Sequence, residues 1–66
     1  MLRNLIAEQA RIGLTNQQMA EALGISRTIY EARLKDGNFK ASHIIKLIEL
    51  FKCDFFYLFN ELIAAA

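Results

Sequence analysis

The sequence predicts an all-α fold of five short helices. The chain contains no proline and only three glycines among its 66 residues, so few positions interrupt a helix. Apolar residues recur at spacings of three and four, as they do on one face of a helix, and they do not alternate as in a half-buried strand. The expected helices cover residues 2–12, 16–23, 27–35, 41–51 and 55–63.

The length and composition indicate one small domain, residues 1–66. A chain of this size buries only about 60% of its unfolded surface, although 55% of its residues are hydrophobic. No apolar run approaches the roughly 20 residues of a membrane-spanning helix, and the start of the chain is amphipathic rather than typical of a signal peptide. Cys53 is the single cysteine, so the chain cannot form an internal disulfide. The absence of an internal disulfide agrees with a reducing compartment. These features predict a cytoplasmic protein.

The first expected helix has an apolar stripe that we expect to pack on the rest of the domain. Its members are Leu2, Leu5, Ile6 and Ala10, and Gly13 ends the helix. Its role is expected to be structural.

The next two helices are predicted by their capping residues. Thr15 is a good N-cap, and Gln18 three residues later completes a Thr-x-x-Gln capping box. Gly24 ends the first of these helices, because glycine adopts the left-handed conformation without steric cost. Ser26 is placed to cap the second.

The turn between them follows the pattern Ala-x-x-x-Gly-Ile-Ser, from Ala20 to Ser26. The small Ala20 permits a close helix crossing, and Ile25 is expected to be buried. This pattern is typical of a helix-turn-helix, here at about residues 16–35. The chain resembles the phage-repressor and Cro-like regulators of the XRE class. The matching residues are Leu14, Thr15, Ala20, Leu23, Gly24, Ile25 and Ser26.

The resemblance implies a lambda-repressor-like domain that binds double-stranded DNA through the second motif helix. Tyr30 and Leu34 are expected to face inward, since they lie one turn apart. The outward positions are then Arg27, Thr28, Glu31, Ala32 and Lys35. By correspondence with the family, the first four of these fall where base-contacting residues usually lie. An arginine can donate two hydrogen bonds to guanine, and threonine or alanine can contact a thymine methyl.

Other residues are candidates for contacts to the DNA backbone. Asn16, Gln17 and Ser26 lie near helix N-termini, where short polar side chains hold phosphates. Lys35, Lys40 and Arg33 surround the loop after the motif. The net charge of the chain is only +1, but residues 27–46 contain five basic and two acidic residues, a net +3. Basic charge on this segment suits a DNA-binding face.

Glu31 has two interpretations. An acid that points into the major groove repels phosphate, and only the N4 amine of cytosine rewards it directly. Alternatively, Glu31 forms an ion pair with Arg27 or Lys35, each one turn away on the same helix, and orients that side chain. The second interpretation is the commoner behaviour of exposed helix residues.

The second half of the chain has weaker local signals. Asp36, Gly37 and Asn38 predict a loop, and either Asn38 or Ser42 is expected to cap the fourth helix. Asp54 is the expected N-cap of the fifth.

A cluster of aromatic and aliphatic residues near the C-terminus exceeds what a small core can bury. Phe56 falls where the family has an exposed charge. We therefore expect a homodimer through the fifth helix and the outer face of the fourth. The expected interface residues are Phe56, Phe59, Leu62 and Ile63. The simpler alternative is that these residues complete an unusually aromatic core.

Catalysis and cofactor binding are not expected. His43 and Cys53 are the only residues of their kinds and stand ten positions apart, without the spacing of a zinc site or of a nucleophile and its base. His43 is expected on the solvated surface and Cys53 in the core. The sequence therefore predicts a DNA-binding transcriptional regulator of repressor type, without metal, cofactor or small-molecule ligand. The alternative is a protein-interaction or antirepressor-type domain of the same fold.

Overall fold

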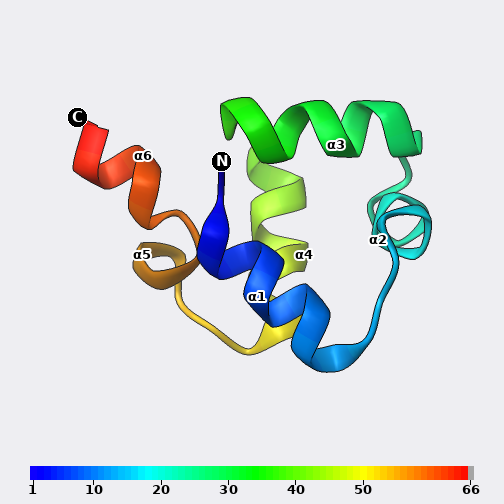
Figure 1. The fold of residues 1–66 in the computed structure, drawn as a ribbon, viewed down its shortest axis with the longest axis horizontal. Coiled ribbons are helices and arrows are strands. Elements are labelled where there is room, and N and C mark those ends of the chain that lie inside the picture. The colour runs from blue at the N-terminus through cyan, green and yellow to red at the C-terminus, as the bar shows by residue number, and fades with distance from the viewer. Residues whose placement is uncertain (66) are drawn as a thin grey trace.

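The structure is a computed structural model that describes residues 1–65 as a set of six helices (Figure 1). The helices are α1 (Arg3–Ile12), α2 (Asn16–Leu23), α3 (Arg27–Asp36), α4 (Ala41–Phe51), α5 (Phe55–Leu58) and α6 (Asn60–Ala65). In Figure 1, α3 lies across the top, α1 and α4 lie below it, and α5 and α6 form the left side of the molecule. The all-α prediction is confirmed, with one more helix than expected.

A single core joins the helices. The side chains that are almost fully buried are Leu2, Leu5, Met19, Ala20, Leu23, Tyr30, Leu34, Phe39, Leu47, Phe51, Leu58 and Phe59. Tyr30 and Leu34 face inward from α3 as predicted. Ile25, expected to be buried, is half-buried at the edge of this core.

The buried face of α1 differs from the prediction at one position. Ala10 is exposed, and Gln9 is buried in its place. Gln9 lies one turn after Leu5, so it follows the same face of the helix inward. A polar amide can occupy this position because the side chain finds hydrogen-bond partners there.

The helix ends of the motif agree with the prediction. The Thr15 hydroxyl accepts from the Gln18 backbone N–H at 3.1 Å, and Gln18 Oε1 accepts from the Thr15 N–H at 2.9 Å. Gly24 ends α2 with φ of 72°, in the left-handed region. The Ser26 hydroxyl accepts from the backbone N–H of Ile29 at 3.2 Å. These bonds satisfy donors that a helix N-terminus leaves unpaired.

The start of α4 was predicted incorrectly. Neither Asn38 nor Ser42 caps it: the N-cap position is Lys40, whose side chain makes no capping bond. Asn38 instead donates its backbone N–H to Asp36 Oδ1 at 2.8 Å, within the turn that Gly37 opens in the left-handed conformation. The side chain of Asp36 therefore stabilises this turn, and Asn38 does not cap α4. At the other end of α4, Lys52 adopts the left-handed conformation with φ of 55°.

The predicted fifth helix is broken in two at Phe59. The backbone of Phe59 leaves the helical region, with φ of −114° and ψ of 33°, and its ring is completely buried. The break turns α6 back toward α1, where Glu61 Oε2 accepts from the backbone N–H of Arg3 at 2.9 Å. The Asn4 amide donates to the carbonyl of Tyr57 at 2.8 Å. Two contacts with α1, one on each side of the break, thus fix the C-terminal segment.

Within residues 1–65, each helix is too short or too polar to span a lipid bilayer.

Candidate nucleic-acid interface

Helix α3 presents one buried face and one open face. Its open side carries the exposed residues Arg27, Thr28, Ala32 and Lys35, which were all predicted to point outward. Glu31 is half-buried, because it lies on the edge of this face that turns toward α2. The open face therefore presents the guanidinium of Arg27, the small side chains of Thr28 and Ala32, and the ammonium group of Lys35 at the end of the helix.

The edge of α3 next to α2 is held by a chain of side-chain hydrogen bonds. The Tyr30 hydroxyl donates to Gln9 Oε1 at 2.6 Å. Gln9 Nε2 donates to Asn16 Oδ1 at 2.8 Å and to the carbonyl of Leu14 at 3.0 Å. Asn16 Nδ2 then donates to Glu31 Oε2 at 3.0 Å. We call Tyr30, Gln9, Asn16 and Glu31 the amide chain; it runs from the core of the domain to the open face of α3.

Every bond of the amide chain points in the same direction. The carbonyl of Leu14 can only accept, so the nitrogen of Gln9 must be the atom that faces it. The oxygen of Gln9 then faces Tyr30, whose hydroxyl keeps its proton because burial raises its pKa, and this hydroxyl donates. Asn16 in turn accepts from Gln9 with its oxygen and donates with its nitrogen. The chain consequently presents an N–H to position 31, which suits the carboxylate of Glu31 as an acceptor.

Glu31 also faces Arg27. Its Oε2 lies 3.8 Å from Arg27 Nε, and the two side chains are 45% and 62% exposed. This is a loose ion pair rather than a close hydrogen bond, and pairs of this kind contribute little to stability. Of the two partners expected for Glu31, the structure shows Arg27.

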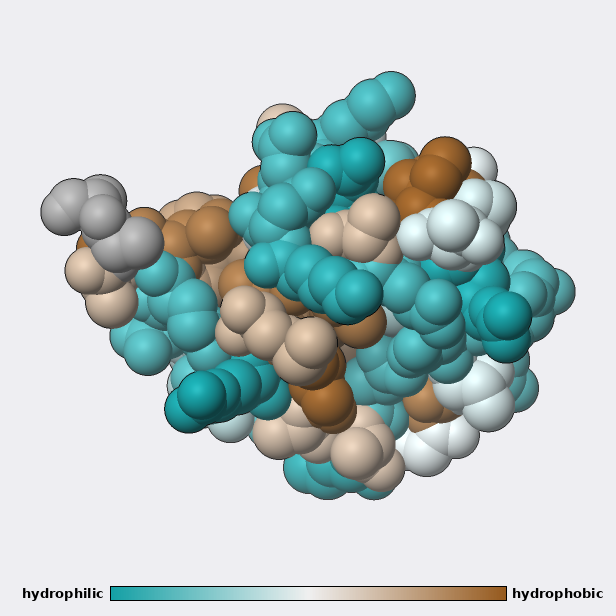
Figure 2. All heavy atoms as spheres, turned by 45° about the horizontal axis from the view of Figure 1, so that its top comes forward, coloured by the Kyte–Doolittle hydropathy of each residue, from teal (hydrophilic) through white to brown (hydrophobic). Residues whose placement is uncertain are grey.

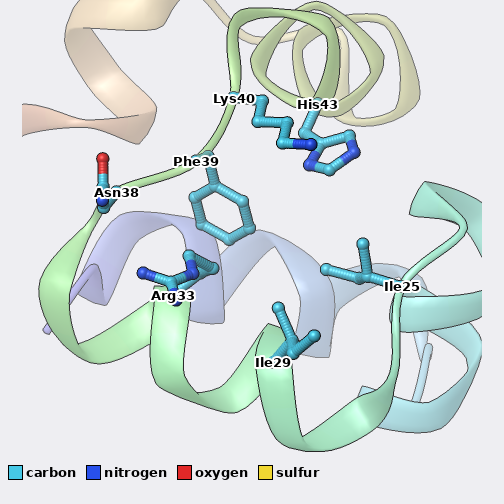
Figure 3. Close-up of a pocket in the computed structure, with 7 residues that line it drawn as sticks. All are labelled: Ile25, Ile29, Arg33, Asn38, Phe39, Lys40 and His43. Carbon is cyan, nitrogen blue, oxygen red and sulfur yellow. The ribbon is translucent and has the colours of Figure 1, made fainter.

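The opposite edge of α3 borders an open groove of about 400 Å³. Figure 3 shows Ile29 and Arg33 of α3 facing Lys40 and His43 across it, with the Phe39 ring between them. The residues that line the groove are Ile25, Ile29, Arg33, Asn38, Phe39, Lys40 and His43. Its floor is apolar and its rim is basic. His43 is half-buried here rather than fully solvated as expected.

The basic residues around this groove differ in their freedom. Arg33 Nη1 contacts Asp36 Oδ2 at 2.7 Å, so part of its charge is balanced locally. Lys40 and Lys35 are exposed. Lys40 is therefore the better placed of the groove residues for a phosphate.

Two of the residues predicted to contact phosphates, Gln17 and Ser26, are exposed to solvent. Gln17 is exposed and donates to Glu21 at 3.3 Å. The Ser26 oxygen accepts from Ile29 as a helix cap, which leaves its O–H free to donate. Asn16 is the exception, because the amide chain engages both ends of its side chain.

The expected dimer interface is only partly exposed. Phe56 is 70% exposed and Ile63 is 40% exposed. Phe59 was predicted wrongly, since it is completely buried: its ring stacks on Phe55 with centroids 5.1 Å apart. Leu62 is 36% exposed and packs on Gly37, where an added β-carbon would lie 2.5 Å from Leu62 Cδ2.

Further apolar side chains are exposed on neighbouring elements, namely Ile45 and Leu50 of α4 and Tyr57 of α5. Figure 2 shows apolar surface on the C-terminal segment, at the left of the view.

Two features of the interface were missed in the sequence. The first is the amide chain, although a glutamine on the apolar face of α1 was a visible signal that a buried polar partner exists. The second is the groove, whose walls come from α3 and from the loop before α4. No pattern in the sequence predicts that the loop before α4 lies close to α3.

Comparison with protein families supports the helix-turn-helix interpretation of α2 and α3. A family model described as helix-turn-helix matches residues 8–58. The chain belongs to this family of DNA-binding regulators, to which the Cro-like and phage-repressor proteins belong. The family is a DNA-binding one rather than an enzymatic one. Neither the curated proteins nor the solved structures gave a match to the chain.

The remaining reactive groups lie apart from one another. Among the residues that the structure describes, no three histidine, cysteine or acidic side chains are grouped closely enough to hold a metal ion. Cys53 is half-buried beside α1, and burial raises the pKa of its thiol. It therefore has little thiolate character.

Proposed function

We propose that this chain is a sequence-specific transcriptional regulator of repressor type, which inserts α3 into the major groove of an operator. The observation that carries this proposal is the exposure of Arg27, Thr28, Ala32 and Lys35 on one face of α3, opposite the buried Tyr30. A recognition helix needs this division, since one side packs on the domain while the other meets base edges.

Each exposed residue has a suitable role in this proposal. Arg27 lies in the first turn of α3 and donates to guanine O6 and N7. Thr28 and Ala32 contact thymine methyl groups or hydrogen-bond a base edge. Lys35, at the far end of the helix, contacts a phosphate.

The phosphates on either side of the groove are held by short polar side chains and by one lysine. Gln17, Ser26 and the remaining amide hydrogen of Asn16 face one strand from the N-termini of α2 and α3. Lys40 faces a phosphate beyond the other edge of α3. Contacts of this type fix the orientation of the domain without reading sequence.

We further propose that the regulator acts as a homodimer through its C-terminal surface. Phe56 of α5, Ile63 and Leu62 of α6, and Ile45 of α4 supply exposed apolar side chains. Large apolar patches of this kind mark interfaces. A two-fold contact there would match a two-fold symmetric operator.

Selection from random oligonucleotides, followed by a salt titration of the selected site, tests the DNA proposal. We expect a two-fold symmetric motif and an affinity that falls steeply as salt rises, with a slope of about −0.9 per neutralised phosphate. Lys40→Ala should reduce that slope by about one contact and weaken all sequences alike. No enriched motif together with a flat salt response would overturn the proposal.

Sedimentation at tens of micromolar tests the dimer. We expect Phe56→Glu to convert the wild-type dimer to a monomer, because it places a charge in an apolar contact. Gln17→Glu, at an exposed position of α2 outside the proposed dimer contact, is a charge control. A wild-type protein that sediments as a monomer, unchanged by Phe56→Glu, would contradict the proposal.

One observation favours a second function, that of a protein-interaction domain without DNA binding. Glu31 adds a negative charge beside the open face of α3. The basic excess of residues 27–46 favours DNA over this alternative. The same selection experiment decides between the two, since an adaptor enriches no motif.

A further inference from the structure

We propose that Gln9 and Asn16 are positioning residues for Arg27, and that they set the base preference of α3 through the carboxylate of Glu31. This inference rests on the proposed function, because it concerns how Arg27 reads a base. It assigns a role in DNA specificity to the buried amide of Gln9, which belongs to α1 and is only 8% exposed.

The hydrogen bonds of the amide chain fix the Glu31 carboxylate before DNA arrives. Asn16 Nδ2 holds Glu31 Oε2 at 3.0 Å, and Gln9 holds the Asn16 oxygen at 2.8 Å. Gln9 cannot rotate its amide without losing its bonds to Tyr30 and to the Leu14 carbonyl. A reversal of the Asn16 amide would likewise set oxygen against oxygen at Glu31. The carboxylate therefore has one preferred place beside α3.

The fixed carboxylate of Glu31 orients the side chain of Arg27. Arg27 is 62% exposed, and its Nε lies 3.8 Å from the fixed Glu31 oxygen. A long exposed arginine loses rotamer entropy when it docks on a base. A fixed carboxylate near its Nε restricts those rotamers beforehand and leaves the terminal nitrogens free for guanine. Support of this kind, behind the contacting group, is how binding sites hold their geometry.

The role proposed for Asn16 is separable from a phosphate contact. Only one of its two amide hydrogens is used by Glu31, so the other remains available to DNA. A phosphate contact affects all sequences equally. A positioning role affects only the base pair that Arg27 reads.

The test measures the affinity of the full chain for the selected operator and for operators substituted at each base pair. The variants are Asn16→Ala, Arg27→Ala and the double variant, with Asn60→Ala on the exposed surface of α6 as the amide control. We expect Asn16→Ala to reduce discrimination roughly 3- to 10-fold at the base pair that Arg27→Ala also affects, a size typical of coupled neighbours. Affinity for random-sequence DNA should fall only by the factor that the lost phosphate contact of Asn16 produces, and this factor should be the same in the wild-type and Arg27→Ala backgrounds. In the Arg27→Ala background, Asn16→Ala should have no further effect on discrimination.

The paired variant Gln9→Met/Tyr30→Phe extends the test to the core. It removes both ends of one hydrogen bond and keeps an apolar volume there. We expect it to reduce discrimination at the same base pair, in the same direction as Asn16→Ala. Thermal melting of each variant shows whether the domain stays folded at the assay temperature.

The inference and the proposed function fail in different ways. A wild-type protein that binds all sequences equally would overturn both. A wild-type protein with a clear preference that Asn16→Ala leaves unchanged would overturn the positioning role alone. Uniform weakening by Asn16→Ala without any loss of discrimination would show that Asn16 serves only as a phosphate contact.

Discussion

Two regions of this small domain, the motif half (α2 and α3) and the C-terminal half (α4 to α6), are stabilised in different ways. In the motif half, α2 and α3 begin with side-chain caps from Thr15 and Ser26, and α2 ends at Gly24. In the C-terminal half, α5 also begins with a side-chain cap, since Asp54 Oδ1 accepts from the backbone N–H of Tyr57 at 2.8 Å as predicted. Helix α4, however, begins at Lys40 without a side-chain cap and ends at the left-handed Lys52. The motif half thus satisfies its helix ends locally, whereas α4 in the C-terminal half depends on contacts with other elements.

This difference matters for function. The motif half must present the same open face of α3 in every molecule, and local caps together with the amide chain restrict its alternatives. The C-terminal half encloses the core with aromatic rings, and it leaves Phe56 exposed, where we propose the dimer contact. Because α4 has no side-chain cap at its start, its position depends on packing. Substitutions that remove packing should therefore affect the C-terminal half most.

The largest expected effect follows removal of the Phe59 ring. Phe59→Ala leaves a cavity between Phe55 and Phe39, whose rings contact it at centroid distances of 5.1 and 6.1 Å. The expected loss is about 4 kcal/mol, close to the whole stability of a domain of this length. Circular dichroism during urea denaturation measures it.

Phe56→Ala is the matched control for this loss. Its ring is 70% exposed, so we expect a change below about 0.5 kcal/mol at concentrations where the protein is monomeric. Equal losses for the two variants would show that the C-terminal half does not depend on its buried rings.

The second largest effect concerns the junction between α1 and the motif half. Gln9→Leu leaves the Tyr30 hydroxyl and the Asn16 oxygen without their partner. We expect a loss of about 2 kcal/mol, the usual consequence of leaving a buried polar group unpaired. Urea denaturation measures this as well, with Gln17→Ala as the control at an exposed amide of α2. Recovery of stability in Gln9→Leu/Tyr30→Phe would identify the phenol as the stranded group, and no recovery would count against that assignment.

The motif half was predictable because its signals are local. The capping residues Thr15 and Ser26, the turn at Gly24 and the inward position of Tyr30 follow from spacing within a few residues. The exposure of Arg27 on the open face of α3 follows from the same periodicity. Sequence alone therefore defined the open face well.

The C-terminal half was less predictable because its structure is decided by distant residues. The helix break at Phe59 depends on packing against Phe55, and on the bond from Arg3 to Glu61. The groove beside α3 depends on how the loop around Phe39 approaches it. The partners of Gln9 lie in other elements in the same way. Periodicity cannot state which distant groups will meet.

A smaller effect, of opposite sign, is expected at the end of α4. Lys52 has φ of 55°, where a side chain costs about 1 kcal/mol relative to glycine. Lys52→Gly removes that cost, and the added freedom of the unfolded chain offsets part of the gain. We expect a net stabilisation of about 0.5 kcal/mol, measured as a higher urea midpoint. A lower midpoint would show that the lysine side chain contributes more than its backbone costs.

The smallest expected effect depends on pH and tests how the C-terminal half is attached to α1. The hydrogen bond from the Arg3 backbone N–H lowers the pKa of Glu61 below its ordinary value of 4.5. A carboxyl with a lowered pKa stabilises the fold above its unfolded pKa, and this contribution is lost as the pH falls through its folded pKa. Wild type should therefore be more stable than Glu61→Gln at pH 7.

The free energies of unfolding of the two proteins should converge as the pH falls through the lowered pKa of Glu61, because protonation makes the two side chains equivalent in charge. Glu8 also has a lowered pKa, chiefly through its hydrogen bond with Arg11, so both proteins lose stability in acid. The difference between them isolates Glu61. Urea midpoints at pH 7 and pH 3 give this difference, with Glu49→Gln on the exposed surface of α4 as the charge-matched control. A difference that stays constant between these pH values would show that packing of α6, such as Leu62 on Gly37, rather than the carboxylate attaches the C-terminal half.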